Sequence, residues 1–424
     1  MRNVELLMPA GNIEKLEYAV RYGADAVYLG VVDFSLRAMR KGEIIILENL
    51  KSAIDLAHKL GAKAYMTLNI FAFNSDIKHL EECMDIIKDA NPDAILVSDF
   101  GILRLLRKYM PDTDIHVSTQ TNILNYECVK FWQDMGATRV VLARELSILE
   151  VAEIKRQVPG MEVECFIHGS QCVSFSGRCL LSDYFTNGER KANSGNCSQP
   201  CRWSYKLVEE TRPGQYYEIN QDDRGSHILS PKDLCLVKHL KEMIDAGVDS
   251  FKVEGRTKSL YYVSAVAKTY REAIDEIMKN PDADMEKYFI ELQKVGNRGY
   301  TTGFALGENK PDSYSYDISK GLAGADFLFE FHDKKKYSEV VFGSDSSDNL
   351  YFVKIKNKIY INDEVEVITP DERFLTKVVE IIDEKGESID LANTNADVYL
   401  KLSVEPKDYE VALARTVGVK EHVC

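Results

Sequence analysis

The chain has 424 residues, 45% of them apolar, which is enough to bury sizeable cores in two or three domains. Its net charge of −14 argues against broad nucleic-acid binding, although a net charge does not exclude a local basic patch. Glu5 interrupts the first short apolar run, so that run does not resemble a signal peptide, and no apolar run reaches the length of a membrane span. We therefore expect a soluble cytoplasmic protein.

Short apolar runs alternate with helical patterns from the first residues onward. The runs predict eight strands, at Val4–Ala10, Ala26–Gly30, Lys63–Asn69, Ala94–Asp99, Ile115–Gln120, Arg139–Arg144, Val163–Gly169 and Phe251–Arg256. Helical periodicity predicts seven helices, at Ile13–Tyr22, Leu47–Leu60, Ile77–Ala90, Gly101–Tyr109, Tyr126–Met135, Ile148–Gln157 and Leu260–Met278. This alternation predicts an α/β fold, a TIM-like (β/α)8 barrel. A doubly wound open sheet is the alternative, although no GxGxxG follows the first strand.

The connection between the seventh and eighth predicted strands is much longer than the others. This cysteine-rich insertion, at about residues 170–250, contains a predicted hairpin of Trp203–Val208 and Tyr216–Asn220 and a predicted helix at Asp233–Ala246. A long insertion after a barrel strand lies at the end where barrels place their active sites.

From about Asp326 the pattern changes to short alternating runs separated by turn residues. They predict further strands at Phe327–Phe331, Glu339–Phe342, Leu350–Lys354, Glu364–Ile368, Lys377–Ile382 and Val398–Leu402. We therefore expect a barrel domain over 1–305, a linker over 306–324 and a small β-barrel domain over 325–424.

Four of the nine cysteines fall within thirty residues of the insertion, at Cys172, Cys179, Cys197 and Cys201. The intervening residues are too polar to form a core, and clustered cysteines in a reducing compartment are more often metal ligands than disulfides. Four thiolates commonly hold an iron–sulfur cluster. Structural zinc is the alternative, although it prefers more closely spaced pairs. Unliganded or redox-active thiols also remain open.

The same segment is locally basic. Between residues 178 and 206 five cations face two anions, Asp183 and Glu189, and the cations are Arg178, Arg190, Lys191, Arg202 and Lys206. Such a patch could bind a polyanion. It could equally be a solvated loop.

Polar residues lie at the ends of the predicted strands and would encircle one mouth of a barrel: Asn69, Asp99, Gln120, Arg144, Glu145, His168, Glu254 and Arg256. We take His168, Glu254 and Gln120 as the catalytic candidates. The candidates for binding an anionic small molecule are Asn69, Arg37, Arg144 and Arg256, because guanidinium pairs with carboxylate. The alternatives are strand ends that meet solvent, ordinary ion pairs and a structural histidine.

The chain resembles the collagenase-like U32 peptidase family over nearly its whole length. The resemblance rests on eight motifs: LMPAG at 7–11, GADAVYLG at 23–30, HVSTQ at 116–120, ECFIHGSQCVSFSGRC at 164–179, NCSQPC at 196–201, SPKDL at 230–234, KVEGRTK at 252–258 and NRGYTTGF at 297–304. Ser170 and Gln171 depart from the small or apolar pair that often precedes the first cysteine. This departure bears on substrate identity more than on cluster binding.

Within the family, the likeness is strongest to members that form 5-hydroxyuridine at the wobble position of tRNA. That resemblance implies tRNA as a partner and a [4Fe–4S] cluster on Cys172, Cys179, Cys197 and Cys201. It also implies prephenate as the hydroxyl source, whose two carboxylates would suit the arginines. A homologous subunit is considered as a further partner.

Two other functions stay open. The family name implies a peptidase, yet no HExxH, GxSxG or P-loop motif is present. A metal-stabilised binding protein without catalysis is the third hypothesis.

Overall fold

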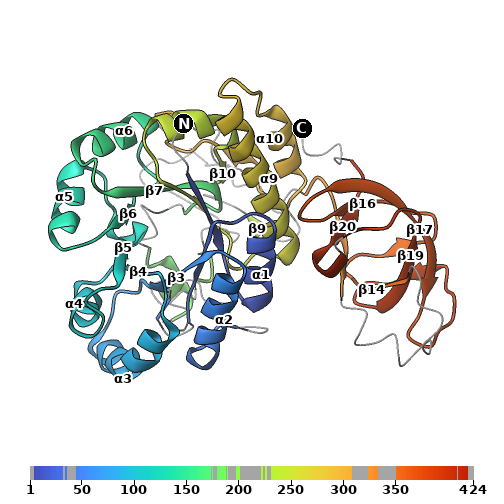
Figure 1. Ribbon diagram of the computed structural model, residues 1–424, viewed down its shortest axis with the longest axis horizontal. Coiled ribbons are helices and arrows are strands. Elements are labelled where there is room, and N and C mark those ends of the chain that lie inside the picture. The colour runs from blue at the N-terminus through green and yellow to red at the C-terminus, as the bar shows by residue number, and fades with distance from the viewer. Residues whose placement is uncertain are drawn as a thin grey trace, which may run out of the picture.

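The computed structural model describes residues 4–31, 34–35, 44–172, 174, 179–187, 189, 197–200, 221–222, 225–226, 231–307, 323–332, 350–407 and 409–418. Figure 1 shows a larger α/β barrel followed by a smaller β-barrel at the C-terminal end of the chain. No helix in the described part of the chain is long and apolar enough to cross a membrane.

Eight parallel strands form the first barrel, and β11 pairs with both β1 and β7 to close it. The strands are β1 Glu5–Pro9, β2 Ala26–Leu29, β3 Lys63–Leu68, β4 Ala94–Val97, β5 Asp114–Val117, β6 Arg139–Val141, β7 Glu162–Gly169 and β11 Ser250–Val253. All eight predicted strands are therefore confirmed, and the open-sheet alternative is wrong. The barrel closes because consecutive strands pair in parallel around the whole ring.

Helices pack around the outside of these strands (Figure 1). They are α1 Ile13–Arg21, α2 Leu47–Lys59, α3 Asn74–Ala90, α4 Phe100–Tyr109, α5 Tyr126–Asp134, α6 Ile148–Gln157, α8 Leu240–Asp245, α9 Leu260–Lys279 and α10 Glu286–Gln293. Side-chain caps begin several of them: Asn12 accepts from the Lys15 amide, Asn125 from Cys128 and Ser259 from Tyr262. The seven predicted helices are confirmed to within a few residues.

The insertion after β7 differs from its prediction in one place. Residues 233–246 do not form one helix, because Asp233–Cys235 form β10, which pairs antiparallel with the end of β7 and parallel with β12, Tyr300–Thr301. A 3₁₀ turn at Val237–His239 and the short α8 follow. Tertiary pairing with β7 overrides the local helical pattern here.

Within the rest of the insertion, the structure describes α7 Leu181–Phe185 and the two-residue strands β8 Gln221–Asp222 and β9 Gly225–Ser226. The predicted hairpin of Trp203–Val208 and Tyr216–Asn220 lies outside the described residues.

Six antiparallel strands close into the second barrel, in the order β13-β14-β19-β17-β16-β20. They are β13 Phe327–Phe331, β14 Leu350–Ile355, β16 Glu364–Ile368, β17 Arg373–Ile382, β19 Asp397–Leu402 and β20 Leu413–Thr416, with β15 Ile359–Tyr360 and β18 Leu391–Ala392 paired beside them. Five predicted strands are confirmed, whereas β20 was not predicted. The run at Glu339–Phe342 lies outside the described residues, and the exact domain and linker boundaries stay predictions.

The second barrel packs on α1, α9 and α10 of the first. The Tyr22 hydroxyl lies 2.8 Å and 2.7 Å from the carbonyl oxygens of Ile368 and Val411, and Tyr261 stacks on Phe327. Arg415 on β20 is fully buried and pairs with Glu291 on α10 and with Glu366 on β16. These contacts fix the small barrel against the outer helices of the large one, as Figure 1 shows.

Candidate active site at the barrel mouth

A cavity of about 470 Å³ opens at the carboxyl-terminal mouth of the large barrel. Every barrel strand except β1 contributes to its wall, through its last residues or the loop that follows. The lining residues are Tyr28, Thr67, Asn69, Leu96, Ser118, Thr119, Gln120, Val141, Arg144, Phe166, Lys252, Glu254 and Arg256. This is the end of the fold where barrels of this type place their chemistry.

The structure brings five of the predicted site residues together in this cavity: Asn69, Gln120, Arg144, Glu254 and Arg256. Asp99 instead caps α4, accepting from the Gly101 and Ile102 amides, and Glu145 is not part of the lining. Arg37 lies outside the described residues. The individual roles of these residues stay predictions.

The cavity is lined by three cationic side chains and one carboxylate. The cations are Arg144, Lys252 and Arg256, and Glu254 lies 4.0 Å from the Arg144 guanidinium. Both Glu254 and Arg256 are buried, so water screens these charges weakly. A pocket with this excess of positive charge is suited to an anionic ligand.

Arg256 is held in place by two hydroxyl groups. Its guanidinium donates to Ser35 Oγ at 2.6 Å and to Thr67 Oγ1 at 3.1 Å, and these two hydroxyls bond to each other. Gly30 leaves the room for them, because a Cβ at this position would collide with both. The glycine that ends the GADAVYLG motif therefore serves to position Arg256.

Two buried residues of the site were missed in the sequence. Lys252 Nζ pairs with Glu164 at 2.6 Å beneath the cavity, and Glu164 also meets Arg139 at 3.3 Å. Burial lowers the pKa of the Lys252 amine, and the Glu164 carboxylate opposes this shift. The signal was available, because a lysine and a glutamate in the middle of strands buried on both faces must be paired to be tolerated.

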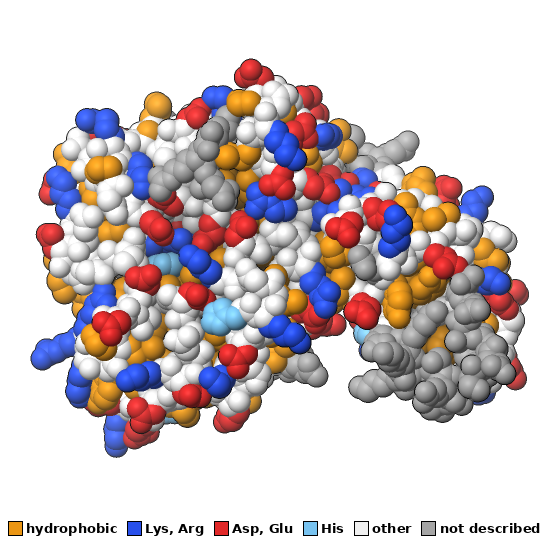
Figure 2. Space-filling model, viewed as in Figure 1, with side chains coloured by type: hydrophobic (Ala, Val, Ile, Leu, Met, Phe, Trp, Pro, Cys, Tyr) orange, Lys and Arg blue, Asp and Glu red, His pale blue; other side chains and the backbone are white. Residues whose placement is uncertain are grey.

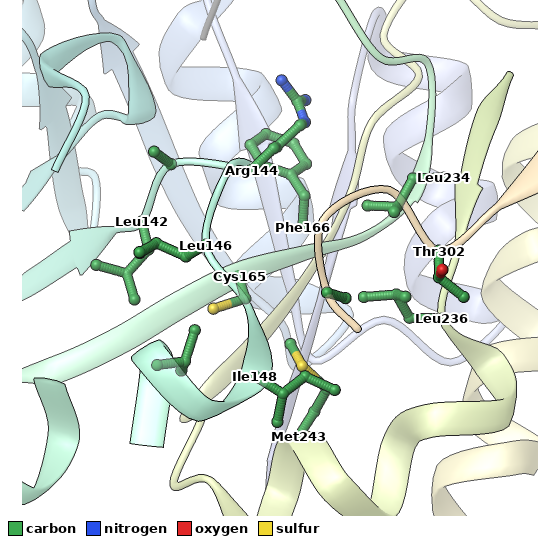
Figure 3. Close-up of a pocket in the computed structure, with 13 residues that line it drawn as sticks. Leu142, Arg144, Leu146, Ile148, Cys165, Phe166, Leu234, Leu236, Met243 and Thr302 are labelled. Atoms are coloured by element: carbon green, nitrogen blue, oxygen red, sulfur yellow. The ribbon is translucent and has the colours of Figure 1, made fainter. Parts of the chain in front are cut away.

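A second, mainly apolar cavity of about 380 Å³ lies between β7, α6 and β10. Figure 3 shows Cys165 among its apolar side chains, and the Arg144 guanidinium pointing away from them. That guanidinium lies 3.7 Å from the centroid of the Phe166 ring. Phe166 and Arg144 line both cavities and so lie between the apolar cavity and the charged mouth cavity.

His168 does not line the mouth cavity. It is buried among Tyr262, Tyr270 and Tyr300, and the Tyr270 hydroxyl lies 3.3 Å from its Nδ1. Burial lowers the pKa of His168 to about 3, so the ring is neutral in the folded protein at physiological pH. This geometry favours the structural alternative over an acid–base role at the mouth.

We predict that His168 makes the fold less stable in acid. Its folded-state pKa of about 3 lies below the ordinary value of 6.5, so between these values the unfolded chain binds a proton that the folded chain does not. Its contribution to the free energy of unfolding should therefore shrink as the pH falls from 6.5 towards 3. Urea unfolding at a series of pH values should show that the free energy of unfolding falls less steeply with decreasing pH in His168→Gln than in the wild-type chain. The same dependence on pH in both chains would contradict this assignment.

The cysteine segment begins where β7 ends. Cys179 Sγ accepts the Leu181 amide at 3.4 Å, and Cys197 Sγ accepts the Gln199 amide at 3.3 Å. Ser182 joins the two stretches, since its hydroxyl accepts the Ser198 amide at 2.9 Å. Hydrogen bonds from backbone amides to sulfur suit thiolate ligands, because they stabilise negative charge on the sulfur atom.

Three of the four predicted cysteine ligands are described, and each is half-buried: Cys172, Cys179 and Cys197. Cys201 and the five cations of the predicted basic patch lie outside the described residues. Among the described residues, no three His, Cys, Asp or Glu side chains gather as a metal site. Cluster binding therefore stays a prediction that rests on the full set of four cysteines.

The family model described as "Peptidase family U32" matches residues 11–315, and the model of the "Peptidase family U32 C-terminal domain" matches residues 337–414. The chain belongs to peptidase family U32. The tRNA hydroxylation protein P of Haemophilus influenzae is 36% identical to it, over 92% of this chain and 90% of that protein. The Escherichia coli protein of the same name is 35% identical, over 97% of this chain and 95% of its own.

A further U32 relative, a 23S rRNA 5-hydroxycytidine synthase of Escherichia coli, is 34% identical over 73% of this chain and 47% of its own length. The region that matches the first family model contains every strand of the large barrel except β1. The resemblance inferred from the motifs is therefore confirmed at the level of the family.

Proposed function

We propose that this U32 chain is an RNA hydroxylase that forms 5-hydroxyuridine at the wobble position of tRNA. The observation that carries the proposal is its similarity, along nearly the full length of both chains, to proteins named for tRNA hydroxylation. The RNA-modifying relative named for 5-hydroxycytidine supports the same reaction class, hydroxylation at a pyrimidine base.

The mouth cavity supports this proposal. A base must leave its stack before an enzyme can modify its ring, and it then needs a pocket with hydrogen-bonding groups. The cavity is open to solvent and is lined by amide, hydroxyl, carboxylate and guanidinium groups, which would offer hydrogen-bonding partners to a base and to a small co-substrate. Asn69 and Gln120 would hydrogen-bond to the base edge, and Glu254 is our candidate for proton transfer.

The excess of positive charge supports an anionic co-substrate beside the base. Prephenate, which carries two carboxylates, is our candidate for the hydroxyl source. Arg144 and Arg256 would each bind a carboxylate, and Lys252 would add a third positive charge at the cavity floor.

We also propose that Cys172, Cys179, Cys197 and Cys201 hold a [4Fe–4S] cluster, which would supply one-electron chemistry. Two observations support this assignment: backbone amides donate hydrogen bonds to the sulfur atoms of Cys179 and Cys197, and Ser182 bonds to Ser198 between the two stretches. The spacing favours iron–sulfur over zinc, because Cys172 and Cys179 are further apart than the close pairs of structural zinc sites, although Cys197 and Cys201 form one such pair.

Replacing Cys179 with alanine should remove most of the iron. The wild-type chain, purified without oxygen, should contain about four irons and four sulfides. Cys128→Ala is the matched control, since Cys128 is exposed on α5 and should leave the metal content unchanged. One zinc per chain without visible colour, or equal iron in both variants, would contradict the cluster.

The hydroxylase function is tested in a bacterial host that lacks its own tRNA hydroxylation proteins. Nucleosides from its tRNA should contain 5-hydroxyuridine when this chain is expressed, and less when Glu254→Gln is expressed to the same level. A peptidase is less well supported, because no histidine or cysteine lines the mouth cavity within the described part of the chain. Cleavage of peptides by the chain, without any 5-hydroxyuridine in the tRNA, would favour the peptidase over the hydroxylase.

A further inference from the structure

Exposed aromatic side chains gather on the outside of the barrel mouth. Phe73 and Phe100 are 64% and 57% exposed, and Phe71 and Phe131 are also exposed. A groove open to solvent runs between Phe71, Phe100 and Phe131, with Trp132 in its wall. Soluble proteins rarely leave several large aromatic side chains together in water unless the surface binds something.

The aromatic rings are already arranged as a platform. Phe100 stacks on Trp132 with ring centroids 5.1 Å apart and planes inclined by 6°, and Phe131 meets both edge-on. Phe100 is the first residue of α4, and Phe131 and Trp132 lie on α5. Neighbouring helices of the barrel therefore hold the stack rigidly, so little ordering is needed on binding.

The groove adjoins the proposed active site. Its Ser98 donates to the carbonyl of Asn69 at 3.3 Å, and Asn69 donates to Ser118 Oγ at 3.3 Å; Asn69 and Ser118 both line the mouth cavity. Thr121, also in the groove wall, directly follows Gln120 of the cavity in one 3₁₀ turn. Cavity and groove are thus adjacent openings above the ends of β3, β4 and β5.

We propose that this groove binds an unpaired RNA base next to the nucleotide that enters the mouth cavity. The inference rests on the proposed function. When a nucleotide is turned out of its strand, its neighbours lose a stacking partner, and aromatic side chains replace that partner for any base. The groove would thereby hold the single-stranded loop of the tRNA while the target uridine is in the cavity.

The lining favours a base over a protein partner. Among the described residues, the large apolar side chains of its lining are all aromatic, and none is a leucine, isoleucine, valine or methionine. Aromatic rings also occur in protein-binding grooves, so it is the position of this groove beside the mouth cavity, where the target nucleotide would enter, that decides for a base. Glu127 is the one charged residue in the described part of the lining, and Lys130 pairs with it at 2.7 Å, which reduces its repulsion of phosphate.

Trp132 provides a direct reporter. Trp203 is the only other tryptophan, so Trp203→Phe leaves one emitting side chain, in the groove wall. An anticodon stem-loop RNA with unpaired loop bases should quench that emission, and a fully paired duplex should quench it less. Phe100→Leu with Phe131→Leu, which keeps the apolar bulk but removes the rings, should raise the Kd for the stem-loop about tenfold. Leu149→Ala, at an exposed apolar position on α6, is the matched control and should leave the Kd unchanged.

The outcomes separate this inference from the proposed function. Unchanged stem-loop affinity in the double variant, while tRNA hydroxylation continues, would overturn the groove and leave the function standing. Ring-dependent quenching by the stem-loop without any hydroxylation would support the groove and remove the function. If light scattering instead shows that the variant only breaks self-association, the surface joins two copies of the chain and the inference is wrong.

Discussion

Replacing Arg256 with alanine is expected to lower kcat/KM for tRNA hydroxylation by at least about 30-fold. The reason is that it would remove the buried ion pair between Arg256 and a carboxylate of the co-substrate, and truncating one partner of such a pair costs about 2 kcal/mol or more. Arg256 lies in the mouth cavity and is held by Ser35 and Thr67. The two hydroxyls can still bond to each other without it, so the fold should survive.

Arg256→Lys separates charge from geometry. Lysine retains the positive charge but cannot form the two parallel bonds that guanidinium makes to a carboxylate, so we expect intermediate activity with a raised KM for the anionic co-substrate. Arg156→Ala is the matched control, since Arg156 lies exposed on α6 and pairs with Glu153 of the same helix. Steady-state kinetics with purified tRNA measures all three variants. Wild-type kinetics for Arg256→Ala would remove this residue from the site.

Replacing Arg415 with alanine is expected to lower the free energy of unfolding by about 1.5–3 kcal/mol, because it removes charge-assisted hydrogen bonds and leaves the half-buried Glu291 and Glu366 to the remaining cations Arg373 and Lys294. Arg415 bonds to Glu291 at 2.6 Å, to Glu366 at 2.8 Å and to the Tyr261 hydroxyl at 3.2 Å. These partners come from both barrels, so the loss should appear as a loosening of the small barrel from α9 and α10. Urea unfolding and limited proteolysis would measure it.

The pH dependence provides an internal check on Arg415. Burial alone would raise the pKa of Glu291, but Arg415, Arg373 and Lys294 hold it below the ordinary value. The stability from this carboxylate is therefore present above the ordinary value of 4.5 and is lost as the pH falls below it. Arg415→Ala should make the free energy of unfolding fall less steeply with decreasing pH in this range. Arg21→Ala is the control and should leave that dependence unchanged, because Arg21 belongs to an exposed ion pair on α1. A change of less than about 1 kcal/mol in Arg415→Ala would contradict the account.

The sequence predicted the large barrel well because its strands and helices have strong, regular apolar periods. Side-chain caps such as Ser259 and the stops at Gly23 and Gly61, both with positive φ, are local features that a sequence displays. The strand at Asp233–Cys235 could not be foreseen in the same way, because its pairing with the end of β7 is set by tertiary contact. The same holds for β20, which closes a barrel between two partners distant in sequence.

The candidate site was predicted in part. Strand-end position sufficed for Asn69, Gln120, Arg144, Glu254 and Arg256, since all parallel strands of a barrel end at one mouth. Strand-end position did not distinguish these cavity residues from His168, which lies at a strand end but is buried among tyrosines from α9 and β12. It also missed Lys252, which lies inside its strand rather than at the end.

Charge illustrates the difference between composition and structure. The chain is strongly acidic overall, yet Figure 2 shows acidic and basic side chains interspersed over the visible face of both barrels. The cations that matter for the proposed reaction lie in the cavity instead, where burial strengthens their effect. An acidic net charge is therefore compatible with an RNA substrate.

The most direct test is mass spectrometry of tRNA nucleosides after reaction with the purified chain under argon, with prephenate present or withheld. The account predicts that 5-hydroxyuridine appears at the wobble position with prephenate, and that Arg256→Ala abolishes it while leaving the fold intact. Unmodified wobble uridine with the wild-type chain and an intact cluster, or full modification by Arg256→Ala, would contradict the proposed active site.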